Sequence, residues 1–446
     1  ARDVVASYEQ KWRCDRDLWS DYGRFLDRHR GDVGTYMRFS SEEFSVAFQK
    51  IRKHKLIDRD GSCLAVLKIF CDTQFECFRK IVSKFLWDWR ALSSNEAVHG
   101  KVFGKEGHFP KPCETRSILP LSSMLKLCDK LIAIRLCSEI SRVWPTPDSC
   151  LFGGRKYTQC LDLAFAGAQV IEKAMDRKSQ GCIMAVDIKQ YYDYLPCLRI
   201  ATKLVDKGVC PRLVSAALAT QICPGVILEL MGQSHTLRFR SIGGLTGSCI
   251  AGMFGSVPVS DVFVSKHKEW EPLSFDLGDR KLLAATWIDN IFVYAGSSLK
   301  ALHIIRDFES ELERCWSLAI KPTSREVLVC KGLKNEADES IWSCKSTMRC
   351  LGHILSYDGS IWPDWRDCKV KMWSVFWMNS GNSQINSLKI ETKLSLLMRS
   401  VYSAINWKLA RWPYPKSIAE ELDGVQVHMV STVSYTHLTL PTNRCG

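Results

Sequence analysis

Apolar residues along this chain follow a helical spacing over most of its length, interrupted by a few short runs typical of strands. Three runs rich in β-branched and aromatic residues, 182–186, 282–288 and 291–295, predict strands. Helical spacing predicts helices over 44–51, 63–85, 119–143, 161–178, 198–207, 212–219, 250–264, 299–315 and most of 361–430. Residues 1–33 are polar and lack a strong pattern, so we expect a linker or the remnant of an upstream helix there.

Two of the predicted strands end at a carboxylate. Asp289 and Asn290 separate the runs 282–288 and 291–295, and such residues favour tight turns, so we expect a hairpin with Asp289 at its tip. Asp187 follows the run 182–186 directly. A single Asp at a strand end is usually a turn or cap residue. The two become a site only if the fold brings them together.

The pattern as a whole predicts an α+β fold, with helices on one side of a small antiparallel sheet that carries these carboxylates. The segment 225–240 is rich in strand-forming residues, 348–360 resembles a short hairpin, and 99–115 reads as a loop with Gly, Pro and Lys. With 446 residues the chain is long enough for two or three structural units.

Composition and charge narrow the class of partner. The chain is 46% hydrophobic and 24% charged, which is ordinary globular usage. Its 61 Lys and Arg exceed its 48 Asp and Glu, giving a net charge of +13, and such a surplus favours a polyanion such as nucleic acid. Many soluble proteins are mildly basic, so charge alone does not decide the partner.

Other classes of protein find little support in the sequence. The 20 Cys include no C-x-x-C pair and the His are scattered, which argues against a structural zinc site. We see no signal peptide, and no apolar run reaches the ~18 residues of a membrane span. The first residue is Ala1 rather than Met, so we expect a fragment of a longer protein. Residues 433–446 resemble a translated cloning scar rather than a native tail.

Seven segments occur in an order that is informative as a set. They are FGKEGHFPKPCETRSIL (103–119), FGGRKYTQCLDL (152–163), AVDIKQYYDYL (185–195), SIGGLTGSC (241–249), WIDN (287–290), LAIKPTSREVLVC (318–330) and MRCLGHILSYDG (348–359). Together they resemble the reverse transcriptase (RNA-directed DNA polymerase) domain of non-LTR retrotransposons, and more broadly the palm of right-hand polymerases, over residues 41–360.

The resemblance implies a right-hand polymerase architecture. Its fingers would occupy residues 34–180, its palm 181–345, and its primer grip and helical thumb 346–432. It also implies an intracellular, nuclear protein that extends a DNA primer with deoxynucleoside triphosphates on an RNA template, without a membrane. Two carboxylates on adjacent strands suit two Mg²⁺ ions, or Mn²⁺, because hard cations prefer oxygen ligands.

The resemblance also assigns roles to individual residues. Asp187, Asp289 and Asn290 would be catalytic, with Asp187 and Asp289 as metal ligands and the carbonyl of Ile188 assisting. Tyr192 would be the steric gate against the ribose 2′-hydroxyl. The remaining assignments are nucleotide contacts by Lys105, Arg116, Arg155, Gly247 and Ser248, with Arg155 on the template or nucleotide side, and a primer grip at Leu351 and Gly352.

Three positions depart from the family pattern. Asn290 replaces the second Asp of a Y-x-D-D-like motif, Thr246 stands where Gln is usual, and Ser324 stands where Lys is usual, with Arg325 beside it. Two interpretations remain open. In the first, Asp187 and Asp289 suffice for catalysis, as in polymerases with a G-D-N motif. In the second, the chain is a degenerate copy that only binds nucleic acid. An RNA-dependent RNA polymerase is a third possibility.

Aromatic residues near the C-terminus have two possible roles. The cluster comprises Trp362, Trp365, Trp373, Trp377, Trp407 and Trp412. We expect these residues to pack the helical thumb rather than to stack on a nucleic-acid strand, because Trp is highly buried on average. We expect His353 to be a polar surface residue.

Overall fold

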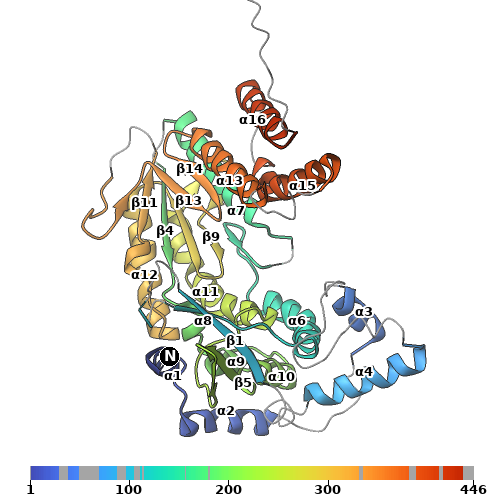
Figure 1. The fold of residues 1–446 in the computed structure, drawn as a ribbon. Coiled ribbons are helices and arrows are strands. Elements are labelled where there is room, and N and C mark those ends of the chain that lie inside the picture. Colours follow the sequence, from blue (N-terminus) through green and yellow to red (C-terminus); the bar gives the residue numbers. More distant parts are fainter. Residues whose placement is uncertain are drawn as a thin grey trace, which may run out of the picture.

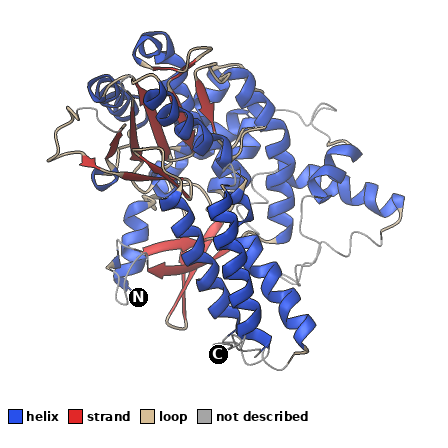
Figure 2. Ribbon diagram, turned by 90° about the horizontal axis from the view of Figure 1, so that it is seen from above, coloured by secondary structure: helices blue, strands red, loops and turns tan. Residues whose placement is uncertain are grey.

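The computed structural model describes residues 2–29, 39–49, 70–87, 97–104, 111–112, 115–155, 157–178, 181–330, 335–380, 388–410 and 415–434. These residues form an α+β fold, as the pattern predicted, but the two larger sheets are mixed rather than antiparallel and cores lie on both faces of the central one rather than on one side (Figure 1 and Figure 2). None of the helices described is long and apolar enough to cross a membrane.

The central sheet contains the two strands with the carboxylates. Its order is β12-β11-β4-β10-β9-β3. Neighbours are antiparallel except β3–β9 and β11–β12, which are parallel. The strands are β3 Cys150–Phe152, β4 Cys182–Asp187, β9 Ala284–Trp287, β10 Asn290–Ala295, β11 Glu326–Val329 and β12 Ser343–Cys344.

Both faces of this sheet are buried, which explains the nearly continuous apolar runs of its strands. In β4, Met184 and Val186 join the core that contains α11 (Cys249–Trp270) and α12 (Ser298–Trp316). Ile183 points to the opposite face, where it joins a second core with α7 (Cys160–Asp176). The alternation along the strand therefore fixes which residues face each layer.

The hairpin between β9 and β10 has a different turn from the predicted one. Asn290 pairs with Trp287, so the turn residues are Ile288 and Asp289 rather than Asp289 and Asn290. Ile288 adopts a left-handed conformation with φ of 58°. A one-residue slip would move the buried side chains of β10 to the wrong faces, so packing overrides the turn preference of Asn290. The predicted strand 282–288 is also divided, since Leu282 belongs to a separate short strand, β8 (Lys281–Leu282).

A second sheet lies below the first in Figure 1, in the order β2-β1-β5-β6. Its strands are β1 Ala97–Gly104, β2 Thr115–Ile118, β5 Gly225–Leu230 and β6 Gln233–Leu237. The loop expected over 99–115 is therefore wrong for 99–104 and for Thr115. Strand β1 pairs in parallel with β5, and such a distant partner leaves no local signal in the sequence.

Each predicted helix is present within the described residues, although residues 70–71 and 119–122 lie outside the helices expected to include them. The helices not yet named are α1 Arg2–Lys11, α2 Arg16–His29, α3 Ser41–Gln49, α4 Asp72–Trp87, α6 Ser123–Val143, α8 Tyr191–Tyr194, α9 Cys197–Asp206, α10 Pro211–Ile222, α13 Trp362–Ser380, α15 Ile390–Leu409 and α16 Lys416–Ser434. Helix α8 was not predicted, and α1 and α2 occupy the segment expected to be a linker or helix remnant. Two short hairpins complete the fold: β7 Phe275–Asp276 with β8 Lys281–Leu282, and β13 Thr347–Cys350 with β14 His353–Ser356. Residues 435–446 of the expected non-native tail lie outside the described residues.

The N-terminal helices are part of the main core rather than a loose linker. Tyr8, Trp12, Tyr22 and Leu26 are each at most 2% exposed and belong to the same core as α6, α11 and α12. The mostly polar sequence of residues 1–33 did not predict this packing, because these helices bury only a few large aromatic and aliphatic side chains.

The C-terminal helices α13, α15 and α16 form a third core. Trp365 is fully buried there, whereas Trp362, Trp377 and Trp407 are 37%, 56% and 38% exposed, so the packing prediction holds for only part of the cluster. Trp412 lies outside the described residues.

His353 is buried, so its prediction as a surface residue is wrong. Its side chain is 0% exposed, and its Nδ1 lies 3.0 Å from Oδ2 of Asp364. Lys408 places Nζ 3.2 Å from Oδ1 of the same carboxylate. Burial alone would raise the pKa of Asp364, but hydrogen bonds and these neighbours lower it below its usual value. The cluster joins the hairpin β13–β14 to helices α13 and α15.

Replacing Lys408 with Met tests this buried cluster. The change leaves the carboxylate of Asp364 buried without its cation, so we expect the free energy of unfolding to fall by about 3–5 kcal/mol. The matched control is Lys369→Met, which removes the half-exposed ion pair with Glu421 at 2.7 Å and should cost less than about 1 kcal/mol. Urea unfolding of the full chain measures both, and equal losses would contradict a special role for the buried pair.

Candidate active site

The fold brings Asp187 and Asp289 to the same end of the central sheet. Asp187 is the last residue of β4, and the antiparallel register pairs it with Asn290 of β10. Asp289 directly precedes Asn290 in the hairpin turn, and its carbonyl accepts a hydrogen bond from the Ile188 N–H at 3.1 Å. The two carboxylates, more than one hundred residues apart in the sequence, are therefore neighbours through backbone pairing.

This arrangement is electrostatically costly when both groups are ionised. Burial, and next the neighbouring Asp289 carboxylate, raise the pKa of Asp187 to about 6, although Lys321 and Arg116 act in the opposite direction. Burial also raises the pKa of Asp289. Oδ1 of Asp187 is buried and has no hydrogen-bond partner, and Asn290 donates only a long hydrogen bond of 3.4 Å to Asp289.

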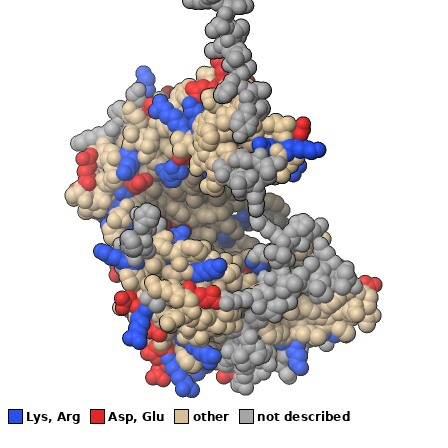
Figure 3. All heavy atoms as spheres, viewed as in Figure 1, with Lys and Arg blue, Asp and Glu red and all other residues tan. Residues whose placement is uncertain are grey.

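A cleft of about 1480 Å³ contains the carboxylate pair. Its cationic lining consists of Lys11, Arg13, Arg116, Lys126, Lys189 and Lys321, against the carboxylates of Asp187, Asp193 and Asp289. In the view of Figure 3 the molecule is hollowed between its upper and lower parts, and Lys and Arg side chains border the hollow. The cleft thus combines an acidic centre with a surplus of positive charge.

Several predicted nucleotide-binding residues line this cleft. Arg116 of β2, Ile188, Tyr192 of α8 and Gly247 all do so. Gly247 has a φ of +93°, a conformation that side chains rarely adopt. The structure therefore places these four residues in the lining of the cleft that contains Asp187. Lys105 lies outside the described residues.

The two adjacent tyrosines have different environments. Tyr191 is 2% exposed and its hydroxyl donates to the carbonyl of Gly255, so it belongs to the core. Tyr192 is half-buried at the cleft, where burial and then the charge of Asp289 raise its pKa to about 12. Tyr192 thus lies within electrostatic reach of the carboxylate pair.

Ser248 is placed in a buried network instead of the cleft. It caps α11, since its Oγ accepts a hydrogen bond from the Ala251 N–H at 3.1 Å and donates one to Asp129. Thr246, two residues earlier, lines the cleft and links the loop to β2, because its hydroxyl donates to the Ser117 carbonyl at 3.3 Å. A hydroxyl is thus engaged at the position where the family has Gln.

Arg155 is also directed away from the carboxylates. Its guanidinium donates to the Trp144 carbonyl at 2.8 Å and to the Ser260 hydroxyl at 3.0 Å. It therefore joins the end of α6 to α11 and is absent from the cleft lining. Its role toward template or nucleotide stays a prediction.

The structure adds Lys321, which sequence reasoning missed. Lys321 lines the cleft and lowers the pKa of Asp187, whereas Arg325 is held in an ion pair with Glu309 at 2.9 Å. Ser324 accepts a hydrogen bond from the Asp187 N–H at 2.9 Å, so it supports the strand end. The sequence does have a Lys directly before Pro322 in LAIKP, but the spacing of the resembled family pattern puts its usual Lys at Ser324 instead.

The predicted primer-grip residues form the turn between β13 and β14. Leu351 and Gly352 have φ angles of 48° and 94°. A Cβ on Gly352 would lie 2.6 Å from the ring of Trp407, so the turn packs closely against α15. Neither residue lines the cleft, and the primer-grip role stays a prediction.

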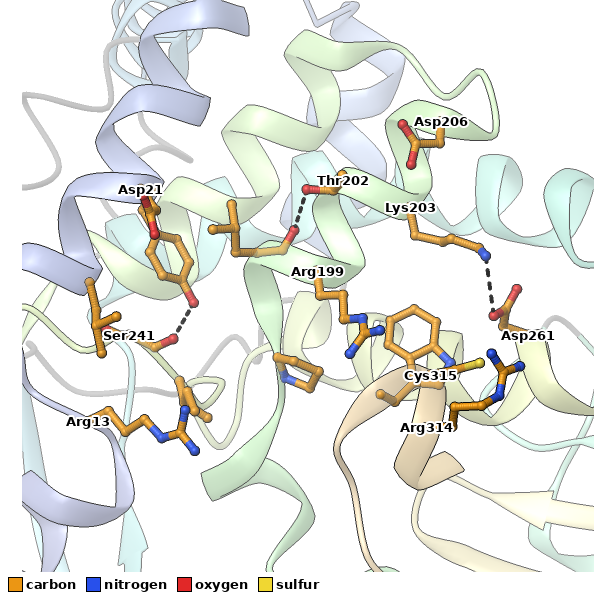
Figure 4. A pocket seen from close by; sticks show the side chains of 16 residues that line it. Arg13, Asp21, Arg199, Thr202, Lys203, Asp206, Ser241, Asp261, Arg314 and Cys315 are labelled. Atoms are coloured by element: carbon orange, nitrogen blue, oxygen red, sulfur yellow. Dashed lines mark hydrogen bonds and ion pairs between the residues drawn. The ribbon is translucent and has the colours of Figure 1, made fainter. Parts of the chain in front are cut away.

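A second pocket of about 650 Å³ lies between α2, α9 and the end of α12 (Figure 4). Arg13 lines both cavities. In Figure 4, Lys203 reaches toward Asp261, at 3.7 Å, and Arg314 lies at the end of α12. Cations and carboxylates are nearly balanced around its wall, so it lacks the positive surplus of the larger cleft.

The donor set fits a divalent metal of the hard type. Asp187 and Asp289 offer carboxylate oxygens, one of them a buried atom without a partner, and Asn290 adds only a neutral amide oxygen. Among the described residues, no group of three or more His, Cys, Asp or Glu side chains is arranged to hold a metal ion. The chain therefore supplies two ionisable ligands at this position.

Comparisons with known proteins give distant structural likeness only. No family model and no curated protein matches the chain. It resembles apo telomerase from Candida tropicalis truncated from its C-terminal domain, at 12% identity and a TM-score of 0.40, over 60% of this chain and 58% of that one. It also resembles telomerase from Candida albicans in complex with a fragment of telomeric RNA, at 11% identity and a TM-score of 0.41, over 82% and 66%. This likeness is too distant to assign an activity.

Metal binding is expected to depend on pH through Asp187. Its pKa of about 6 lies above the ordinary value, so a proton competes with a divalent ion below pH 6 and not above it. We expect the dissociation constant for Mn²⁺ to fall about tenfold per pH unit up to pH 6 and to level off by pH 8. Isothermal titration calorimetry measures this. An affinity that does not change between pH 5 and pH 8 would contradict a ligand role for Asp187.

Asp289→Asn tests the repulsion between the two carboxylates. Well above the pKa of Asp187, about 6, its carboxylate is charged beside Asp289, so removing the charge of Asp289 should stabilise the metal-free protein by about 1 kcal/mol. At pH 5, where Asp187 holds its proton, the gain should vanish. Urea unfolding in EDTA at both pH values measures this difference. A variant that is less stable at pH 8 than the parent chain would show that the carboxylates do not repel.

Proposed function

We propose that this chain is an RNA-directed DNA polymerase of the non-LTR retrotransposon type, a nucleotidyltransferase that extends a DNA 3′-hydroxyl on an RNA template. The observation that carries the proposal is the pairing of β4 with β10, which brings Asp187 and Asp289 together within a cleft lined by cations. Neither carboxylate alone supports a polymerase centre. Together they form the oxygen donor pair that two-metal phosphoryl transfer requires.

Asp187 and Asp289 would hold Mg²⁺, or Mn²⁺, with the Ile188 carbonyl assisting. Such an ion supplies two kinds of chemistry: it lowers the pKa of the attacking hydroxyl and stabilises charge on the leaving pyrophosphate. Asn290 adds no charge, so the site would hold a second ion weakly. This is consistent with activity that depends strongly on the metal supplied.

The chain's own cations would bind and orient the nucleotide. Arg116 and Lys321 flank Asp187 closely enough to lower its pKa, and both line the cleft. In that position they would neutralise the triphosphate, and Lys321 would give a proton to the departing pyrophosphate. Gly247 permits close approach of the backbone, and Tyr192 would exclude the ribose 2′-hydroxyl.

The rest of the cleft suits a nucleic-acid duplex. Lys11, Lys126 and Lys189 add to its positive lining. Lys side chains contact phosphates without reading base sequence, which is what a polymerase needs along its primer and template. In this proposal α13, α15 and α16 form the thumb, the sheet β2-β1-β5-β6 and its helices belong to the fingers side, and the protein acts in the nucleus.

A nucleic-acid-binding protein without catalysis is the second candidate. Asn290 favours it, because the residue paired with Asp187 in the register is an amide rather than a carboxylate. Such a protein would keep the cationic cleft and lose the reaction. The two candidates differ only in turnover, so binding experiments do not separate them.

Primer extension separates the candidates. We expect the chain to extend a DNA primer on an RNA template in Mn²⁺, more slowly in Mg²⁺, and the Asn290→Asp variant to be at least tenfold faster in Mg²⁺ because its third carboxylate holds the second ion. The control is Asp187→Asn, which should abolish product. No product from either the parent or the Asn290→Asp protein would reject the enzyme and leave the binding protein.

A further variant in the same assay distinguishes DNA from RNA synthesis. Removing the bulk of Tyr192 as Tyr192→Ala should allow ribonucleotides to enter. A parent chain that already prefers ribonucleotides, and is unchanged by this substitution, would identify an RNA-dependent RNA polymerase instead.

A further inference from the structure

The end of helix α1 reaches the base of the cleft. Ser7, Gln10, Lys11 and Arg13 all contribute to the cleft lining. Between them in the sequence, Trp12 is 1% exposed and points into the protein. The polar N-terminal segment therefore contributes to the surroundings of the proposed nucleotide site, although no sequence motif singled it out.

Trp12 contacts the segment that carries Tyr192. Its indole Nε1–H donates a hydrogen bond to Oδ1 of Asp193 at 3.2 Å. Asp193 follows Tyr192 within the single turn of α8, so a hydrogen bond to one residue restrains the backbone of the other. Trp12 is not among the described residues that line the cleft, whereas Tyr192 and Asp193 are, so its influence on a nucleotide would pass through them.

Trp12 also fixes the glycine loop, residues 241–248. Its carbonyl accepts hydrogen bonds from the Ser241 N–H at 3.0 Å and the Ile242 N–H at 3.2 Å. Two residues further on, the Gly244 N–H donates to the Tyr192 carbonyl at 2.9 Å. The helix end, the glycine loop and the Tyr192 turn are thus joined in a closed set of hydrogen bonds.

Gly243 shows how closely these three segments pack. A Cβ on this residue would lie 3.1 Å from Trp12 Cδ1 and from the Asp193 carbonyl oxygen, and 3.2 Å from the Tyr192 carbonyl oxygen. Its φ is +93°, so a side chain would be strained as well as crowded. A shift of Trp12 must therefore move the Tyr192 turn, the loop or both.

Neighbouring contacts hold Trp12 in place. The ring centroids of Tyr8 and Trp12 lie 4.8 Å apart, and Cζ of the buried Arg240 lies 5.3 Å from the centroid of the Trp12 ring. Thr115, which precedes Arg116 on β2, donates a hydrogen bond to the Tyr8 hydroxyl at 3.3 Å. The helix end thus also contacts the strand that carries the proposed triphosphate ligand.

We infer that Trp12 is a positioning residue for sugar selection: it holds the Tyr192–Asp193 turn against the glycine loop, so that Tyr192 keeps a fixed distance from the sugar of the incoming nucleotide. The inference rests on the proposed function, because it assumes that a nucleotide occupies the cleft. The positioning itself is a property of the fold and is measurable without turnover.

Trp12→Phe removes the indole N–H and keeps an aromatic ring in the core. The matched control is Trp19→Phe on α2, which removes an indole N–H that donates to the Ile222 carbonyl at 3.4 Å, away from the cleft. We expect the amides of Gly243 and Gly244 to exchange with solvent at least tenfold faster in the first variant and unchanged in the second. Unchanged exchange in Trp12→Phe overturns the positioning, whatever the activity.

Nucleotide selectivity is measured on the full chain bound to an RNA template and a DNA primer that ends in a dideoxynucleotide, so that no reaction is needed. We expect the parent to bind a deoxynucleotide more tightly than the matching ribonucleotide, and Trp12→Phe to lose about tenfold of that ratio. Asp193→Ala, which removes the acceptor from the other side of the bond, should do the same, and Trp19→Phe should keep the ratio.

The outcomes separate this inference from the proposed function. If the parent binds neither nucleotide, the proposed function fails, and the exchange result alone decides the positioning. If the parent discriminates and both Trp12→Phe and Asp193→Ala discriminate equally well, the selection role is overturned. Should Trp12→Phe prove unfolded by its thermal melt, Asp193→Ala carries the test, since its side chain is only half-buried.

Discussion

The antiparallel pairing of β4 with β10 is the constraint on which the site depends. The register that places Asn290 opposite Asp187 also places Asp289 in the turn, beside the end of β4. Alternate side chains of both strands enter different cores, so the register cannot slip without exposing one of them. The burial of apolar side chains far from the carboxylates therefore holds these two groups close together, although they repel each other when both are charged.

That repulsion gives the site its chemical character. Burial raises the pKa of both carboxyls, and the charge of Asp289 raises that of Asp187 further, while Lys321 and Arg116 offset only part of this effect. In the proposed function a divalent ion would balance the charge of this pair. Asn290 adds only a neutral amide oxygen there, so it would limit how firmly the site holds a metal.

The sequence predicted the local elements well and their long-range partners poorly. The apolar run 182–186 predicts β4, helical periodicity predicts most of the helices, and Asp187 and Asp289 stand out at the ends of predicted strands. The hairpin turn was misplaced by one residue because Asn290 has a strong turn preference that packing overrides. The sequence of residues 99–104 predicts a loop, whereas strand β1 there depends on pairing with β5, which lies far away in the sequence. His353 looked exposed because only the fold reveals the buried Asp364 and Lys408 beside it. The sequence does not single out Lys321 or Trp12 for the same reason: the importance of each depends on contacts that only the fold brings together.

The central claim is that Asp187 and Asp289 hold a divalent cation together. Crystals of the chain soaked in Mn²⁺ test it directly, through the anomalous scattering of the metal. We predict a peak within coordination distance of both carboxylates, with the buried Oδ1 of Asp187 among its ligands. A fully soaked crystal with no peak between them, or with the two carboxylates too far apart to share an ion, would contradict the account.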